Sequence, residues 1–312
     1  MFDIRRYTKA DEQVWNSYVA TAKNATFLFN RSYMDYHKDR FTDFSLLFYK
    51  KEKLYALLPA HIKKDVLYSH FGLTYGGLIM DHQVTSADTL VLFEELNAYL
   101  RMRNITKVAY RPTPSIYHSI PAEEDLYALF KVCHARIVAR DIASTVVMER
   151  RLKWSHGRKE GINRCLKNDI RVEKSDDYAA FWKILTDNLT HKYDTLPVHS
   201  LEEIQLLKQK FPENIQLFVA EKGETMLGGT VLYLTPQVVH VQYISASPEG
   251  KQYRVLDAIF NHIINEVYTG YKFFDFGKST EDGGQILNES LIYQKEGFGG
   301  RGLCYDTYEW SL

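Results

Sequence analysis

Cysteine is scarce in this sequence, and its spacing is not that of a metal site or a disulfide framework. The 312 residues contain three cysteines, Cys133, Cys165 and Cys304, which lie far apart and form no CxxC pair. A zinc site or a set of disulfides is therefore not expected, and we predict no metal cofactor. Isolated thiols that are buried or half-buried are the ordinary alternative.

An excess of one charge and long apolar runs are also missing. Thirty-nine basic residues balance 39 acidic ones, so no global electric field favours nucleic acid or an acidic membrane surface. Nowhere do about 18 apolar residues follow one another, which excludes a predicted transmembrane helix. The N-terminus shows no cationic stretch leading into an apolar run, as a signal peptide would. We therefore expect a cytoplasmic protein.

What is present is the composition of a folded protein of ordinary polarity. Hydrophobic residues make up 45% of the chain and charged residues 25%, which is typical of soluble globular domains. The length suits two domains of common size. Hydrophobic periodicity alternates between strand and helix along the whole chain, which predicts an α/β or α+β fold with a mixed sheet and helices on both of its faces.

The two halves of the chain show the same order of predicted elements. In the first half, two strands over residues 44–49 and 54–62 precede a helix over 86–103 and a strand over 107–110. In the second half, a hairpin over 215–234 precedes a helix over 251–268 and a strand over 272–276. A repeated order at nearly constant spacing indicates a duplicated domain. We place the two domains at residues 1–150 and 151–312.

The polar residues that could carry chemistry gather near the C-terminus. The run FDFGKSTEDGGQILNESLIYQKEGFGG, residues 274–300, begins with the end of a predicted strand, opens at Gly277 into a polar loop and continues into a predicted helix over 286–295. Ligands of such sheets bind where neighbouring strands part at their carboxyl ends. The ordinary alternative is that Asp275 orders the loop and the glycines turn the chain.

This run resembles the C-terminal signature of the Fem-type transferases. Those proteins are aminoacyl-tRNA-dependent peptidyl transferases of cell-wall synthesis, with relatives in polysaccharide and envelope pathways. The resemblance implies a pair of acetyltransferase-like (GNAT-like) domains, which agrees with the duplication. It extends more weakly through residues 217–268, the basic segment 158–167 and residues 69–79.

The resemblance also implies roles for individual residues. Lys295 matches the family's helical lysine, whose ammonium stabilises the charge that develops at the reacting carbonyl. The family commonly has Phe just before that lysine, whereas this chain has Gln294. An amine acceptor must lose a proton, and Asp275 is our first choice of base, with Glu296 as a second choice and Tyr243 as a hydrogen-bonding partner.

Acyl-CoA, such as acetyl-CoA, is one possible donor. GNAT enzymes hold the CoA pyrophosphate on backbone amides of a Gly-rich turn at a helix N-terminus. At that position the chain has SPEGKQYR, residues 247–254, in which Gly250, Lys251 and Arg254 are the candidate cofactor-binding residues. The turn has one glycine and carries Glu249, so a solvated helix start remains the alternative.

Further residues are candidates for substrate binding because they are polar and adjoin these segments. Residues 190–199 could cover the acceptor or be an ordinary loop, and the basic residues of segment 158–167 could meet the phosphates of a nucleotide-linked substrate or form a solvated helix face. The substrate-binding candidates are Tyr243, Lys278, Ser279, Glu281, Asn288, His191 and His199.

These observations predict an acyltransferase that moves an activated acyl group, from acyl-CoA or an aminoacyl donor, to an amine of a cell-envelope or polysaccharide precursor. A small-molecule or nucleotide-linked precursor is the expected partner. Two alternatives stay open. One is a peptidyl transferase that uses aminoacyl-tRNA, against which the balanced charge and Gln294 argue. The other is a GNAT pair that binds ligands without catalysis, which the single glycine of residues 247–254 favours.

Overall fold

The chain folds into two compact units whose boundaries interleave in the sequence. The computed structural model describes the backbone of residues 1–312 and every side chain except that of Tyr193. The first unit contains Met1–Asp141, Thr280–Ile286 and Cys304–Leu312, and the second contains Ile142–Ser279 and Leu287–Leu303. The predicted boundary after residue 150 therefore differs from the division by contacts, because the strands β9 (Arg136–Val147) and β17 (Arg301–Ser311) each give residues to both units.

The first unit combines short strands with four α-helices. One sheet has the order β1-β3-β4-β7, and other strands follow the order β17-β8-β6-β5-β2. The strands of this unit besides β9 and β17 are β1 (Asp3–Arg6), β2 (Thr42–Asp43), β3 (Leu46–Lys50), β4 (Lys53–Leu58), β5 (His61–Lys63), β6 (Val66–Tyr68), β7 (Ile79–Met80) and β8 (Lys107–Tyr110). Its α-helices are α1 (Glu12–Thr21), α2 (Arg31–Met34), α3 (Ser86–Arg101) and α4 (Glu124–Lys131).

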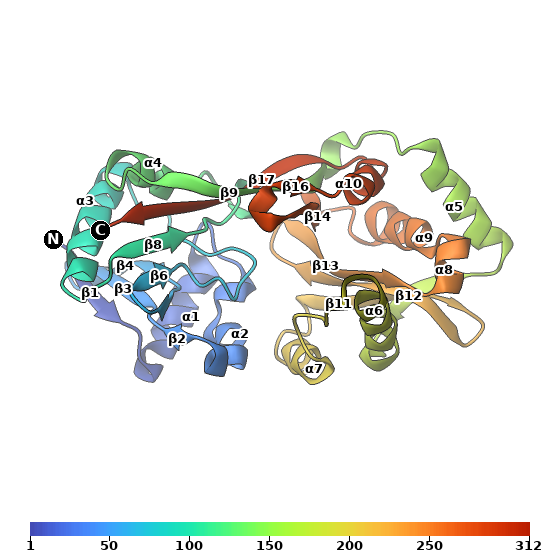
Figure 1. The fold of residues 1–312 in the computed structure, drawn as a ribbon, viewed down its shortest axis with the longest axis horizontal. Coiled ribbons are helices and arrows are strands. Elements are labelled where there is room, and N and C mark those ends of the chain that lie inside the picture. Colours follow the sequence, from blue (N-terminus) through green and yellow to red (C-terminus); the bar gives the residue numbers. More distant parts are fainter. The chain divides into compact units, whose positions relative to one another are not determined.

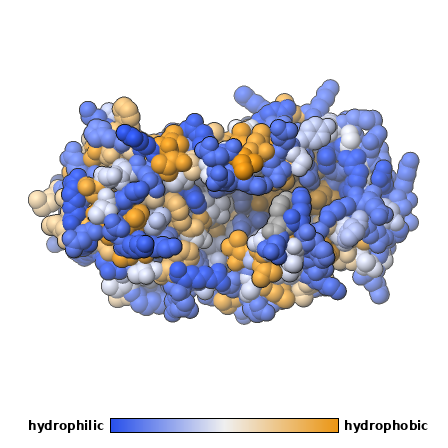
Figure 2. All heavy atoms as spheres, viewed as in Figure 1, coloured by the Kyte–Doolittle hydropathy of each residue, from blue (hydrophilic) through white to orange (hydrophobic). Residues whose placement is uncertain are grey.

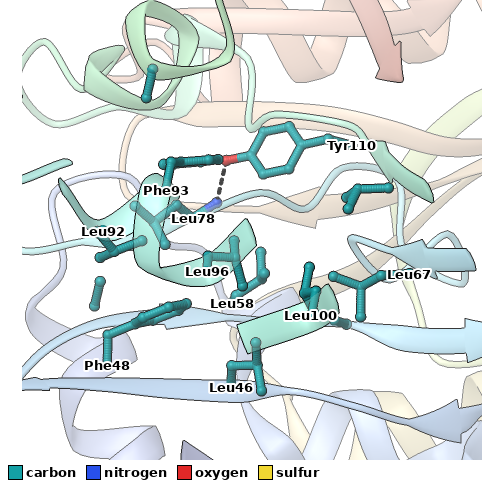
Figure 3. Packing of buried hydrophobic residues seen from close by; sticks show 14 of the residues in the cluster. Leu46, Phe48, Leu58, Leu67, Leu78, Leu92, Phe93, Leu96, Leu100 and Tyr110 are labelled. Carbon is teal, nitrogen blue, oxygen red and sulfur yellow. Dashed lines mark hydrogen bonds between the residues drawn. The ribbon is translucent and has the colours of Figure 1, made fainter. Parts of the chain in front are cut away.

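Helix α3 packs its apolar face against the hydrophobic core of the first unit. Its buried residues Leu92, Phe93, Leu96 and Leu100 recur at helical spacing and pack with side chains of the β3 and β4 strands (Figure 3). The N-cap Thr85 accepts a hydrogen bond from Asp88, so the helix begins where the periodic pattern begins. The predicted strand over residues 54–62 is in fact two strands, β4 and β5, which belong to different sheets.

A buried carboxyl group lies at the edge of this core. The hydroxyl of Tyr110 donates to Asp125, at 2.5 Å. The same hydroxyl accepts from the backbone N–H of Leu78, at 2.6 Å (Figure 3). The backbone N–H of Leu126 donates to the other carboxyl oxygen, at 2.8 Å. Burial raises the pKa of Asp125 from 3.8 to about 7, because the charged form loses its hydration.

We expect this carboxyl group to make the stability of the first unit pH-dependent. Since the folded pKa lies above the unfolded value, the stabilising contribution of the neutral form is present below pH 3.8 and is lost as the pH rises to about 7. Asp125→Asn should remove this loss, which amounts to roughly 4 kcal/mol for a shift of this size. Urea unfolding of both proteins at pH 4, 6 and 8 checks it; parallel stabilities at all three values would contradict the buried neutral carboxyl.

The second unit is a mixed sheet with helices on both faces, as predicted (Figure 1). The strand order is β10-β11-β12-β13-β14-β9. Its strands besides β9 and β17 are β10 (Arg171–Ser175), β11 (Ile215–Lys222), β12 (Thr225–Leu234), β13 (Val238–Ala246) and β14 (Phe273–Lys278). Its α-helices are α5 (His156–Lys167), α6 (Tyr178–Tyr193), α7 (Leu201–Lys210), α8 (Pro248–Tyr253), α9 (Val255–His262) and α10 (Glu289–Glu296).

The predicted hairpin of residues 215–234 is confirmed, and the predicted helix of residues 251–268 is corrected. Strands β11 and β12 pair antiparallel around a turn at Gly223, whose φ of 60° favours glycine. The long helix is interrupted at Arg254, which adopts the left-handed conformation with a φ of 63° between α8 and α9, and a π-helical turn, Ile263–Val267, follows α9. The predicted helix of residues 286–295 begins later, because Ile286–Leu287 form the short strand β16, which pairs with β15 (Thr280–Glu281).

The surface carries mostly polar and charged side chains, and apolar residues are scattered over the face shown in Figure 2. Within the described part of the chain, no helix combines the length and the apolar character that crossing a membrane requires.

Candidate active site

A cavity of about 480 Å³ opens in the second unit between helices α6, α9 and α10 and the strands β13 and β14. Its walls are mainly apolar. The apolar lining residues are Leu185, Leu189, Val241, Ile244, Ala246, Leu256, Phe260, Phe276, Leu291 and Phe298. The polar lining residues are Asn188, His191, Lys192, Ser245, Lys251, Gln294 and Lys295. The predicted catalytic residue Lys295 therefore lines the same cavity as residues of the predicted segments 190–199 and 247–254.

The cavity lies where the parallel strands β13 and β14 stop pairing. Their register runs from Val238 opposite Phe273 to His240 opposite Asp275 and goes no further. The pairing of β14 with β9 shifts register between Asp275 and Lys278, and Gly277 within this bulge has a φ of 69°. A bulge bends its strand and re-aims the side chains beside it. Gly277, which the sequence analysis places after the strand end, lies within β14, and the use of this bulge as an active site stays a prediction.

Lys295 reaches this bulge from α10. Its ammonium donates to the carbonyl oxygen of Gly277, at 2.9 Å, and to that of Lys278, at 2.5 Å. An ammonium has three N–H donors, so one is left for a ligand, as far as the described residues show. Lys295 is only 7% exposed, and this burial lowers its pKa from 10.5 to about 8, an effect that the charge of Asp275 partly offsets. At neutral pH the group is still mainly cationic.

Asp275 lies behind the bulge and is fully buried. One carboxylate oxygen accepts from the Thr145 hydroxyl and from the backbone N–H of Gly277, each at 3.1 Å. The other lies 2.8 Å from Nδ1 of His240. Asp275 therefore accepts from the N–H of Gly277 while Lys295 donates to its carbonyl oxygen, although Asp275 is not among the residues that line the cavity.

His240 was missed by the sequence analysis. It lies next to Asp275 because the two residues face each other in the parallel register of β13 and β14. The only signal in the sequence is a polar residue within the otherwise apolar run VVHV, and such a residue needs a buried partner. Which residue of the neighbouring strand supplies it depends on register, which one sequence does not reveal.

Backbone amides of the predicted CoA-binding turn donate hydrogen bonds to acceptors within the protein. The N–H of Gly250 donates to the Ser247 hydroxyl at 3.0 Å, that of Lys251 donates to the Ser247 carbonyl, and that of Ser247 donates to the Leu227 carbonyl. Pro248 has no N–H. A Cβ on Gly250 would lie 2.1 Å from the Leu227 carbonyl oxygen, so glycine here permits close packing of α8 on β12. These contacts do not fit a cradle of free amides for a CoA pyrophosphate.

The cationic side chains of this turn also have partners. Arg254 forms an ion pair with Asp257, at 2.9 Å, and Asp257 in turn pairs with Arg158 of α5, at 2.5 Å. The Lys251 ammonium donates to the side-chain oxygen of Asn188, at 2.5 Å. Of the three predicted cofactor-binding residues, the structure therefore brings only Lys251 to the cavity.

Asn188, which the sequence analysis also missed, connects α6 to the end of β13. Its amide nitrogen donates to the Ser245 hydroxyl at 2.7 Å and to the Ala246 carbonyl at 2.8 Å. His191 follows three residues later on α6 and also lines the cavity. Its Nδ1 lies 2.6 Å from the Asp187 carbonyl oxygen. A carbonyl only accepts, so Nδ1 carries the proton, and Nε2 of the neutral ring has the lone pair.

Tyr243 and His199 pair with each other near the cavity, without lining it. The Tyr243 hydroxyl lies 2.5 Å from Nδ1 of His199, and Trp182 packs edge-on against the Tyr243 ring and donates to the His199 carbonyl. Burial raises the pKa of Tyr243 to about 12. The contacts tie the end of the segment 190–199 to strand β13.

The remaining predicted residues are spread around the loop after β14. Lys278 contributes its carbonyl oxygen to Lys295, and the carbonyl of buried Ser279 accepts from the backbone N–H of Asn288, at 2.9 Å. The Asn288 side chain caps α10 by accepting from Leu291. Glu281 is exposed and belongs to the first unit by its contacts. The second choice of base, Glu296, is exposed as well. Among the described residues, no group of His, Cys, Asp and Glu is arranged to hold a metal ion.

Sequence comparison assigns the second unit to a known kind of domain. Residues 158–283 match the family model described as "Acetyltransferase (GNAT) domain". This range contains the turn at residues 247–254 and the strands that part at the cavity, and it confirms the prediction of a GNAT-type acyltransferase. None of the curated proteins compared with the chain matches it.

Solved structures share the fold over nearly the whole chain at low sequence identity. The crystal structure of FemX is similar with a TM-score of 0.68 and 10% identity, over 99% of this chain and 97% of that one. The structure of L-PGS from Bacillus licheniformis has a TM-score of 0.61 and 12% identity, over 98% and 92%. A tandem GNAT protein from the clavulanic acid biosynthesis pathway has a TM-score of 0.51 and 9% identity, over 100% and 98%.

These similarities confirm the predicted architecture. Residues 158–283 match a GNAT acetyltransferase domain, and the whole chain has a tandem GNAT fold that is similar to the structures of FemX and of the tandem GNAT protein.

Proposed function

We propose that this protein transfers an activated acyl group to an amine of a cell-envelope or polysaccharide precursor, and that the reaction takes place at Lys295. The observation that carries the proposal is a mainly buried ammonium at the wall of an apolar cavity, fixed by two carbonyl oxygens of a strand bulge. A fixed cation in a site of low dielectric stabilises an oxyanion without reorganising during the reaction. The similarity to FemX supports an envelope precursor as acceptor.

In this mechanism the acceptor amine attacks the acyl carbonyl carbon, and the carbonyl oxygen becomes negatively charged. The third N–H of Lys295 donates to that oxygen. The amine loses its proton to Nε2 of His191, which lines the same cavity. The tetrahedral intermediate then collapses, the bond to the leaving group breaks, and the leaving group takes the proton from His191. The products are the amide and the free carrier.

Asp275 has a different role in this proposal from the one that its sequence position first indicated. Its two oxygens are engaged by Thr145, Gly277 and His240, and the residue is fully buried. We therefore assign it the positioning of Gly277, which it binds through the backbone N–H and whose carbonyl oxygen accepts from Lys295. The proton acceptor is His191, which is exposed at the cavity.

The proposal does not depend on a CoA pyrophosphate bound at residues 247–254, where the amides of Ser247, Gly250 and Lys251 are hydrogen-bonded within the protein. An acyl ester or an acyl thioester of another carrier presents the same reacting carbonyl. No step of the mechanism depends on the identity of the carrier.

The test is a transfer assay with amine-bearing envelope precursors and several activated acyl donors, in which the amide product is detected by mass spectrometry. Wild-type protein should form the amide with at least one donor. Leu291→Trp should not, because the larger side chain fills the cavity in front of Lys295. Circular dichroism controls for folding. Equal product from the folded Leu291→Trp variant would exclude this cavity as the site.

The lowered pKa of Lys295 predicts how the rate responds to alkaline pH. The reaction needs the charged form, which is lost above about pH 8. We therefore expect kcat/KM to fall about tenfold per pH unit above that value. Lys295→Arg keeps a charge at all accessible pH values, so its residual activity should lack this fall. A wild-type profile that stays flat to pH 10 would contradict the role of the ammonium.

A further inference from the structure

The charges that line the cavity are all of one sign. Lys192, Lys251 and Lys295 contribute ammonium groups and His191 an imidazole, and the described lining residues include no Asp or Glu. Two of these cations already have neutral partners: Lys251 donates to Asn188, and Lys295 donates to two backbone carbonyls. None of the polar groups that line the cavity is thus an anion that could pair with a positively charged substrate.

Two buried carboxylates of the second unit, Asp275 and Asp257, are engaged by other residues. Asp275 contacts His240 and Thr145 behind the bulge, and Asp257 pairs with Arg158 and Arg254. If either carboxylate turned to a ligand in the cavity, its present partner would lose its counter-charge. The free-energy cost of that loss in a buried site exceeds the gain from a new, more exposed ion pair. These groups therefore do not serve as counter-ions for a ligand in the cavity.

The remaining wall suits an apolar chain. Ten of the lining residues are aliphatic or aromatic, and Phe260, Phe276 and Phe298 form one connected aromatic cluster with ring centroids 5.0 to 5.5 Å apart. An ammonium group placed against this wall would lose its hydration without gaining a counter-ion. A methylene chain gains free energy by the same transfer.

We infer that the acyl group transferred by this enzyme is neutral and apolar, and that the cavity rejects acyl groups that carry a free ammonium, as aminoacyl groups do. The inference rests on the proposed function and names its donor class: an apolar acyl ester or thioester. The acceptor nitrogen forms the new C–N bond, the C–O or C–S bond to the carrier breaks, and the amine proton ends on the carrier. No oxidant or reductant takes part.

Gln294 offers a sharp test because it lines the cavity next to Lys295. Gln294→Glu has nearly the same shape and adds the missing carboxylate. Gln294→Leu is the matched control, since it adds no charge. The probes are hexanamide and 2-aminohexanamide, which share one carbon skeleton and differ by the α-ammonium. Neither is reactive, so their affinities can be measured by chemical-shift titration of the full-length protein at pH 7.

We expect wild type and Gln294→Leu to bind hexanamide at least about tenfold more tightly than 2-aminohexanamide, and Gln294→Glu to shift this ratio at least about tenfold toward the ammonium probe. Equal or tighter binding of 2-aminohexanamide by wild type would overturn the inference while the cavity remained the binding site. So would a ratio that Gln294→Glu leaves unchanged. If neither amide perturbs resonances of cavity residues, or if Leu291→Trp leaves binding intact, the cavity itself is the wrong site and the proposed function fails too.

Discussion

Lys295→Met is expected to lower kcat/KM for acyl transfer by about 100- to 1,000-fold, the loss typical of removing one fixed donor to an oxyanion. Methionine has a similar length and no charge, so the cavity keeps its shape while the ammonium disappears. Because the effect should lie in the stabilisation of the transition state, we expect kcat to carry most of the loss and KM to change little. Steady-state kinetics at pH 7 on both proteins measure it.

The folded state should tolerate this substitution. Burial of a charged lysine lowers its pKa, which means that the charge itself destabilises the native state, and methionine removes that cost. Against this, the carbonyls of Gly277 and Lys278 lose their donor, at about 1–3 kcal/mol for a buried unsatisfied group. The two effects oppose each other. A Lys295→Met protein that folds normally and turns over at the wild-type rate would refute the assigned role.

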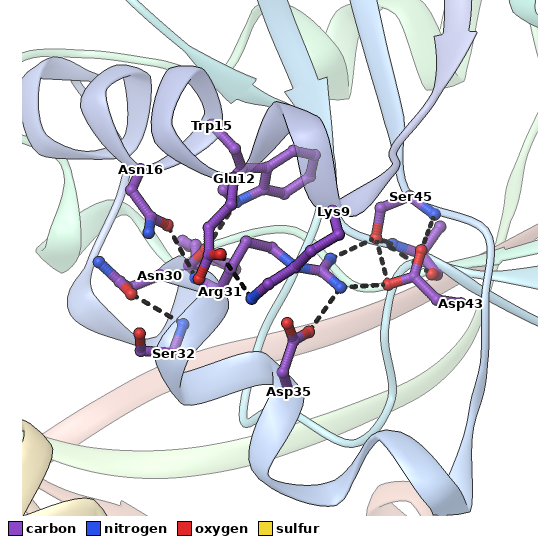
Figure 4. A network of polar contacts seen from close by, with 12 residues as sticks. Lys9, Glu12, Trp15, Asn16, Asn30, Arg31, Ser32, Asp35, Asp43 and Ser45 are labelled. Carbon is purple, nitrogen blue, oxygen red and sulfur yellow. Dashed lines mark hydrogen bonds and ion pairs between the residues drawn. The ribbon is translucent and has the colours of Figure 1, made fainter.

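Arg31→Ala is expected to have the largest effect on stability. Arg31 is 4% exposed and forms ion pairs with Asp35, at 2.6 Å, and Asp43, at 2.7 Å (Figure 4). Its guanidinium carbon also lies 3.8 Å from the centroid of the Tyr7 ring. Removing one partner of such a network leaves the two carboxylates facing each other, and we expect a loss of about 3–5 kcal/mol in unfolding free energy.

Urea unfolding of the purified protein measures this loss. Arg31→Lys should lose less, because it keeps the charge but not the planar fork that reaches both carboxylates. Arg103, which is exposed and stacks on Tyr99, supplies the matched control: Arg103→Ala should change the stability by no more than about 1 kcal/mol. Similar losses for Arg31→Ala and Arg103→Ala would show that the network contributes little.

The parts of the fold that could be predicted from the sequence are those set by local pattern. The hairpin turn at Gly223 and the strand of residues 238–246 follow from alternation and turn chemistry. The strand that carries Asp275 also follows from its composition, although β14 continues through Gly277 to Lys278. Helix α7 begins at its capping box of Ser200 and Glu203, where the sequence places the cap.

What could not be predicted depends on contacts between distant residues. Arg254 breaks a helix whose hydrophobic period continues across it, because its left-handed backbone turns the chain between α8 and α9 and its side chain pairs with Asp257. The partner of Asp275 is set by the register of two parallel strands. The division of strand β17 between the two units also depends on contacts between distant residues, so the sequence alone did not predict it.

The choice of Lys295 as the candidate catalytic residue came from resemblance, and its environment came from the structure. The sequence placed Lys295 late in a helix, and the fold then showed which atoms it contacts and which residues share its cavity. The chain shares its architecture with FemX, yet the described cavity lining offers an aminoacyl ammonium no counter-ion. Fold similarity therefore does not fix the acyl group.

The most direct test of the central claim is to titrate Lys295 itself. Its side-chain carbons can be followed by NMR against pH in wild type, with Lys295→Met to assign the signal. A midpoint near pH 8 that coincides with the alkaline fall of kcat/KM is the predicted result. A midpoint near the ordinary value of 10.5, or a rate that falls independently of this titration, would contradict a buried catalytic ammonium.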